Sequence, residues 1–112
     1  SKRKNEQMAQ VIWTEPALQD LNEIAEYIAL DKVSAAKKLI QQIFSSTERL
    51  EKFPKSGRKV PELQESRYLE IIVSPCRIFY RVEKNKIYIL YVMRSERALR
   101  NYLLDERTNE SS

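Results

Sequence analysis

Arginines recur through the segment Cys76–Arg97 (CRIFYRVEKNKIYILYVMRSER) near the end of the chain. A guanidinium group binds oxyanions through paired hydrogen bonds and stacks on aromatic rings, so this segment suits the recognition of phosphate or carboxylate groups. The candidate target- or partner-binding residues are six cations and one aromatic residue from this segment and from the loop before it: Arg58, Lys59, Arg77, Phe79, Arg81, Arg94 and Arg97.

The chain has no histidine, which limits the catalysis that these cations could support. Metal-free RNA cleavage requires a general base for the 2′-hydroxyl and a general acid for the leaving oxygen, whereas arginine stays protonated at physiological pH. If the protein were a nuclease, its catalytic set would be Arg77, Arg94, Arg97 and Glu70, with Glu96 as a second candidate base. No partner acid is evident, so we predict a surface that binds without catalysing a reaction.

An alternating strand would present these arginines on one side. In residues 76–82 (CRIFYRV), Arg77, Phe79 and Arg81 share one face, and the apolar residues that begin with Cys76 share the other. We expect the apolar face to pack beneath helices. If no further layer covers the second face, it is an open, basic and partly aromatic surface.

Ion pairing is the alternative for the same arginines. Arg77 and Arg81 could bind Glu70, Glu83 or a C-terminal carboxylate and merely solubilise the sheet. We favour pairing for Arg81, near the strand end. Arg77 lies deeper among apolar residues, where an unpaired charge is costly, and is the better candidate for binding.

Past the last expected strand, Arg94, Arg97 and Arg100 recur at three-residue spacing. On a helical turn they would lie on one side. Glu96 and the C-terminal carboxylates are close enough in sequence to neutralise them.

Two amphipathic helices precede the strands. A short strand at residues 9–13 leads to Thr14, a favourable N-cap, after which apolar residues recur at helical spacing. Residues 30–34 interrupt the pattern, Ser34 could cap a second helix, and Pro54 ends it. Two such helices joined by a short break should form an antiparallel hairpin.

Residues 53–62 (FPKSGRKVPE) contain Gly57, the only glycine, and form a basic loop. Its cations are either simply solvated or bind an anion or a partner.

Three strand signals follow, at residues 67–73, 76–82 and 87–93, and the last two flank a turn centred on Lys84-Asn85, where Asn85 tolerates a positive φ. The order is therefore β-α-α-β-β-β. Because helices and strands are segregated, we predict an α+β fold with a helical hairpin packed on an antiparallel sheet.

The chain has 112 residues, a net charge of +4 and one cysteine, Cys76, which we interpret as a small buried hydrophobic residue. We predict a flexible tail or cloning remnant at residues 1–8, with Met8 as the natural start, a single domain at 9–104 that could end in one or two helical turns, and a disordered tail at 105–112. No apolar run is long enough to span a bilayer, so we expect a cytoplasmic protein without a membrane partner.

Four stretches in this order resemble the RelE/ParE superfamily of bacterial type II toxins, and within it the ParE branch: WTEPALQDLNEIAEYI, ERLEKFPKSGRKVPEL, RYLEIIVSPCRIFYRV and IYILYVMRSER. Together they cover nearly all of residues 9–104. The resemblance implies the hairpin-on-sheet fold and a toxin held inactive by a cognate antitoxin, whose disordered segment folds over it. ParE-like toxins act on DNA gyrase, whereas RelE-like relatives cleave mRNA on the ribosome.

Within the superfamily, Arg77 matches a shared arginine, and Arg94 stands where many nuclease relatives carry histidine. The lysines of RelE-like enzymes are replaced by Leu69, Glu70 and Ile71. The resemblance thus implies a ParE-like toxin that inhibits DNA gyrase by binding, without cofactor or metal.

Its predicted antitoxin contact combines the open sheet face with a groove beside the hairpin, and it would meet operator DNA only through the antitoxin. One alternative is a RelE-like, ribosome-dependent mRNA interferase, that is, a metal-independent endoribonuclease. Another is a toxin-derived module that retains only antitoxin binding and operon repression.

Overall fold

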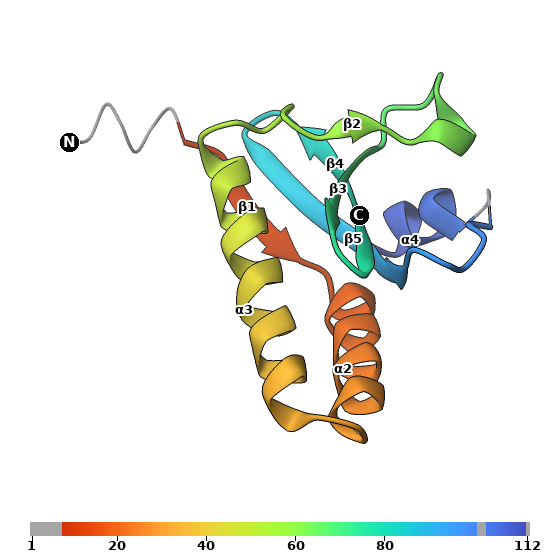
Figure 1. Cartoon of the computed structure of the whole chain (residues 1–112). Coiled ribbons are helices and arrows are strands. Elements are labelled where there is room, and N and C mark those ends of the chain that lie inside the picture. The colour runs from red at the N-terminus through yellow and green to blue at the C-terminus, as the bar shows by residue number, and fades with distance from the viewer. Residues whose placement is uncertain (1–7, 101–102, 112) are drawn as a thin grey trace.

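A helical hairpin follows the first strand, β1 (Gln10–Trp13), in the computed structural model, which describes residues 8–100 and 103–111 (Figure 1). Its helices are α2 (Glu15–Ala29) and α3 (Val33–Glu48), and α3 continues into a 3₁₀ turn, η1 (Arg49–Glu51). The predicted hairpin is therefore confirmed.

Thr14 caps α2 as expected. Its hydroxyl accepts a hydrogen bond from the Ala17 amide at 3.4 Å and donates one to the Ile89 carbonyl at 2.7 Å, which ties the helix start to the sheet. The expected cap at Ser34 is wrong, because α3 begins at Val33, with Lys32 in the cap position two residues earlier and no side-chain bond.

Five strands form one sheet in the order β1-β5-β4-β3-β2. Its other members are β2 (Arg58–Lys59), β3 (Leu69–Val73), β4 (Cys76–Glu83) and β5 (Lys86–Arg94). The pairs among β2 to β5 are antiparallel, as predicted, but β1 pairs with β5 in parallel. The sheet is thus mostly antiparallel, and β2 is a two-residue strand inside the predicted basic loop.

The turn between β4 and β5 lies where we predicted it. Glu83 pairs with Lys86 across it, but the residue with a positive φ is Lys84, at 58°, rather than Asn85. Ser74-Pro75, in the turn between β3 and β4, is a cis peptide.

Side chains on β4 alternate as predicted, and both faces of the sheet are covered. Ile78 and Tyr80 pack beneath α2 and α3 in one apolar cluster, and Phe79 packs on the other side in a second cluster. A β-bulge between Phe79 and Tyr80 shifts the register, so that Leu90 and Tyr91 of β5 both join the second cluster.

The second face is not the open surface that we expected. Arg77, Phe79 and Arg81 are only 8%, 0% and 2% exposed. The covering layer comes from the segment around η2 (Pro61–Leu63) and from the C-terminal helix α4 (Leu103–Ser111), which lies on the opposite side of the sheet from the hairpin (Figure 1).

We predicted a disordered tail at residues 105–112, but residues 105–111 belong to α4. Leu104 is fully buried in the second cluster, and the Tyr68 hydroxyl hydrogen-bonds to Asp105 and, at 3.2 Å, to Thr108. Residues 95–100 form a turn followed by irregular chain instead of a helical turn. The predicted tail at residues 1–8 lies, except for Met8, outside the described residues.

Among the described residues, no helix is both long and apolar enough to cross a membrane.

Candidate functional site

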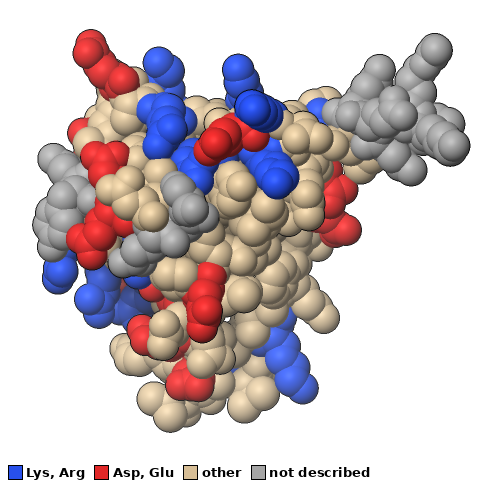
Figure 2. All heavy atoms as spheres, turned by 180° about the vertical axis from the view of Figure 1, so that it is seen from behind, with Lys and Arg blue, Asp and Glu red and all other residues tan. Residues whose placement is uncertain are grey.

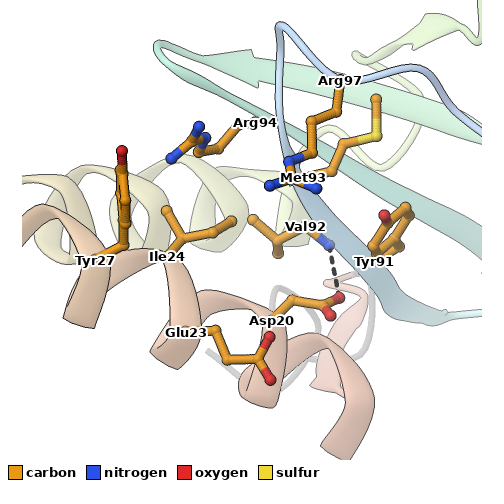
Figure 3. Close-up of a pocket in the computed structure, with 9 residues that line it drawn as sticks. All are labelled: Asp20, Glu23, Ile24, Tyr27, Tyr91, Val92, Met93, Arg94 and Arg97. Atoms are coloured by element: carbon orange, nitrogen blue, oxygen red, sulfur yellow. Dashed lines mark hydrogen bonds between the residues drawn. The ribbon is translucent and has the colours of Figure 1, made fainter.

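A pocket with a volume of about 360 Å³ lies between α2 and the end of β5 (Figure 3). Two of the predicted binding residues, Arg94 and Arg97, line it. Figure 3 shows the acidic side chains of Asp20 and Glu23 on the helix side, the two arginines at the strand end, and Ile24 between them. The pocket therefore has one acidic wall, one basic wall and an apolar floor.

Arg94 is held by an aromatic ring and a carboxylate. Its guanidinium carbon lies 4.6 Å from the centre of the Tyr27 ring, and its Nη2 lies 2.5 Å from Glu96 Oε1. Hydrogen bonding to Tyr27 raises the pKa of Arg94, with a smaller contribution from Glu96, so the group stays charged. Its Nε is buried and finds no hydrogen-bond partner within the described part of the chain.

The acidic wall is tied to the C-terminal helix. Asp20 accepts hydrogen bonds from the Val92 amide at 3.1 Å and from Arg107 Nη2 at 3.2 Å. Burial raises the pKa of Asp20, and these bonds oppose that shift. Arg107 also lies 4.5 Å from the centre of the Tyr91 ring. The charge of Asp20 is thus balanced from α4, whereas Glu23 on the acidic wall and Arg97 on the basic wall are exposed.

A second group of charges surrounds Glu70, which is fully buried on the far face of the sheet. Its two oxygens accept hydrogen bonds from Arg58 Nε at 2.6 Å and Arg77 Nε at 2.7 Å. The outer nitrogens of Arg77 donate to the two oxygens of Glu62 at 2.9 and 2.8 Å. These bonds raise the pKa of Arg77, and the bond from Arg77 lowers the pKa of Glu62. Arg77 is therefore saturated by two carboxylates.

The sheet register separates the two groups. Arg77 pairs with Met93, which packs with Phe79 in the second cluster, whereas Arg94 pairs with Cys76, which faces the hairpin. The residues of the hypothetical nuclease set therefore do not converge: Glu70 and Arg77 lie on one face, and Arg94 is directed to α2 on the other.

The remaining predicted residues differ in exposure. Arg81 pairs with Glu83 and lies 4.2 Å from the centre of the Tyr88 ring, which is the ion pairing that we favoured for it. Phe79 is fully buried. Lys59 is exposed on β2. Seen from behind, Lys and Arg side chains gather in the upper part of the molecule, where β2 lies in Figure 1, with acidic side chains among them (Figure 2).

Sequence reasoning missed several residues of these two groups, among them Asp20, Tyr27 and Glu62. Tyr27 and Asp20 line the pocket on α2, and Glu62 binds Arg77 from η2. Asp20 carried a usable signal, because it is four positions before Ile24 on the buried side of the helix. Glu62 carried none, because its place depends on a single 3₁₀ turn in a loop.

Comparison with known proteins gives consistent results. The family model described as the ParE toxin of the type II toxin-antitoxin system parDE matches residues 11–99. The chain is 31% identical over 91 residues to Toxin RelE2 of Caulobacter vibrioides, covering 80% of this chain and 99% of that protein. It is 35% identical over 81 residues to Putative toxin Y4kP of Sinorhizobium fredii, covering 72% of this chain and 82% of that protein.

Two solved structures share the fold. The chromosomal ParDE toxin-antitoxin system from P. aeruginosa contains a chain with a TM-score of 0.65 and 26% identity, covering 80% of this chain and 99% of that one. The toxin-antitoxin complex RelBE2 from Mycobacterium tuberculosis contains one with a TM-score of 0.54 and 18% identity, covering 78% and 98%, which is a likeness of fold alone.

Proposed function

Because the chain belongs to the ParE toxin family of type II toxin-antitoxin systems, we propose that it inhibits DNA gyrase by binding and that a cognate antitoxin neutralises it. The inhibition would take place in the cytoplasm, and operator DNA would be contacted only through the antitoxin. The alternative within the superfamily is a ribosome-dependent mRNA interferase.

The observation that favours binding over RNA cleavage is the separation of the charged groups. General acid–base catalysis requires a base and an acid within hydrogen-bond reach of one substrate. Glu70 is fully buried and holds two arginines, Arg77 is bound by two carboxylates, and Arg94 lies on the other face of the sheet. This arrangement supports charge recognition and offers no paired proton donor and acceptor around one phosphate.

The pocket of Figure 3 is the surface that we propose for contact with the target. Arginine and tyrosine side chains are the usual anchors of protein interfaces, and Arg94, Arg97 and Tyr27 stand together at its rim. Tyr27 is 61% exposed, and the apolar Leu30, at the tip of the hairpin, is 86% exposed. A partner could therefore bury apolar surface next to the arginines.

The same end of the hairpin is the proposed antitoxin contact. The open sheet face that we predicted for this contact is covered by η2 and α4. The surface of α2 and the arginine wall remain accessible. The ParDE structure to which the chain is similar is a toxin-antitoxin system, which supports a cognate antitoxin as the partner.

A supercoiling assay with purified gyrase and relaxed plasmid tests the proposal. We expect added protein to abolish supercoiling or to trap cleavage complexes. Arg94→Ala combined with Arg97→Ala should weaken the inhibition at least tenfold. Arg49→Ala removes an exposed arginine outside the pocket and serves as the control. The absence of any effect at a large excess of protein would contradict the proposal.

The similarity to a toxin named RelE2 is the observation that favours the interferase alternative. In that case, in vitro translation would give codon-linked cuts in the transcript, and Arg77→Ala would abolish them. A third outcome, harmless expression without any partner, would indicate a module that only binds an antitoxin.

A further inference from the structure

The two carboxylates that bind Arg77 differ in their position. Glu70 is fully buried in the sheet and aligns Arg58 and Arg77 through their Nε atoms. Glu62 lies on the single turn η2, with 35% of its side chain exposed. One carboxylate is thus part of the sheet, whereas the other reaches the arginine from a surface loop.

Glu62 binds Arg77 in the way that a separate ligand would. Both of its oxygens accept a hydrogen bond, from Nη1 at 2.9 Å and from Nη2 at 2.8 Å, in the fork arrangement of guanidinium and carboxylate. The Phe79 ring lies 4.9 Å from the guanidinium carbon and covers one of its faces. This ring blocks approach from that face, and the flat carboxylate of Glu62 approaches edge-on instead, in the guanidinium plane.

The charges of the site match a monoanion. Arg58 and Arg77 carry two positive charges and Glu70 one negative charge, which leaves a single positive charge for Glu62 to balance. Because Glu70 belongs to the sheet and binds both Nε atoms, it would keep the two arginines aligned without Glu62.

We propose that Arg58, Glu70 and Arg77 form a carboxylate-binding site that Glu62 occupies as an internal ligand, and that an acidic side chain of a protein partner replaces Glu62. Such exchange preserves the charge balance of a nearly buried arginine while it connects the partner to the sheet. Arg58 and Glu70, but not Arg77, also line a groove of about 580 Å³ beside Ile72, in which the rest of the partner segment could lie. This proposal does not depend on gyrase being the target.

An external ligand can bind only those molecules in which the internal ligand has left the site open. Its apparent affinity is therefore the intrinsic affinity multiplied by the open fraction. If Glu62 leaves the site open in a tenth of the molecules or fewer, its removal should tighten binding about tenfold or more. The increase should require Arg77.

Hexaglutamate, with hexaglutamine as the uncharged control peptide, is the probe for the purified chain. Binding is followed by the NMR signals of the arginine Nε–Hε groups at constant ionic strength. We expect Glu62→Ala and Glu62→Gln to bind hexaglutamate at least tenfold more tightly than the unchanged protein. Glu65→Gln, which alters an exposed acid of the same segment, should have no effect, and adding Arg77→Lys to Glu62→Ala should remove the gain.

Two results would overturn the proposal. If Glu62 only fastens η2 to the sheet, Glu62→Ala will lower the melting temperature and leave the hexaglutamate affinity unchanged. If the variant gains affinity for an oligothymidylate of matched charge but not for hexaglutamate, the site takes phosphate groups from nucleic acid instead. Neither result bears on gyrase inhibition, which the supercoiling assay measures separately.

Discussion

Replacing Glu70 by glutamine tests the buried charge network most severely. The carboxylate is fully buried and accepts a hydrogen bond from the Nε of Arg58 and another from the Nε of Arg77. Glutamine has nearly the same shape, but its amide nitrogen can only donate, so one arginine N–H would face another donor. The substitution also leaves the nearly buried guanidinium of Arg77 with one charge partner, Glu62, instead of two.

The expected cost follows from the exposure of the two arginines. The Arg77 side chain is only 10% exposed, and breaking a buried ion pair on one side typically costs about 3–5 kcal/mol. Because Glu62 still binds Arg77, we expect the lower end, about 3 kcal/mol. The Arg58 side chain is 59% exposed, so Arg58→Gln should cost less than about 1 kcal/mol.

Urea unfolding followed by the fluorescence of Trp13, the only tryptophan, measures both changes. A domain of this size has a total unfolding free energy of about 5–15 kcal/mol, so a loss of 3 kcal/mol is easily resolved. The slope with urea should stay constant, which shows that the same surface is exposed. If Glu70→Gln costs under about 1 kcal/mol, or no more than Arg58→Gln, the reasoning about burial is wrong.

Three further predictions concern the loop, the surface ion pair and the cysteine. Gly57→Ala would place a methyl carbon 2.5 Å from a tyrosine hydroxyl oxygen and should destabilise the protein by about 1–3 kcal/mol in thermal unfolding, whereas the neighbouring Ser56→Ala should change little. Because Arg77 lowers the pKa of Glu62 below its ordinary value of 4.5, their ion pair stabilises the folded state above that pH and is lost as the pH falls through the folded pKa. The difference in unfolding free energy between the unchanged protein and Glu62→Gln should therefore be largest near pH 7 and shrink below pH 4.5, and a difference that grows as the pH falls would contradict this. Burial raises the pKa of the Cys76 thiol to about 11, so a thiol reagent at pH 7.4 should label it only after denaturation, and rapid labelling of the folded protein would show that the strand opens.

The helical hairpin and the three long strands could be predicted because each follows from the periodicity of nearby residues. The apolar stripe of α2 and the cap at Thr14 define the first helix without any knowledge of its neighbours. Alternation in residues 76–82 assigned the faces of β4 correctly. These features depend on residues a few positions apart, which a single sequence displays directly.

The cover on the second face could not be predicted, because it depends on contacts between distant residues. Simple alternation along the strands predicts that this face is half polar. The β-bulge beside Phe79 instead turns Leu90 and Tyr91 to the same side, which makes the face apolar. The short helix α4 contains few apolar residues and forms where Leu104 and Tyr68 meet. Its own sequence gives no amphipathic pattern.

The candidate site shows the same division. The pairing of Arg81 with Glu83 was expected, because the two residues are neighbours on one strand. For Arg77, pairing with Glu70 is the alternative to the binding role that we favour, and the structure shows this pair. The second partner, Glu62, is held by a loop whose position depends on tertiary packing, and the pocket around Arg94 requires the crossing of α2 over β5.

The number of mRNA molecules cut per protein molecule on programmed ribosomes tests the central claim, that this protein acts by charge and shape and does not transfer protons. We predict no turnover: over a time course, transcript mapping should show no codon-linked cuts above background, while the same preparation inhibits gyrase. Repeated cleavage by each molecule, with a rate that titrates near neutral pH and is lost in Arg77→Ala, would contradict the account.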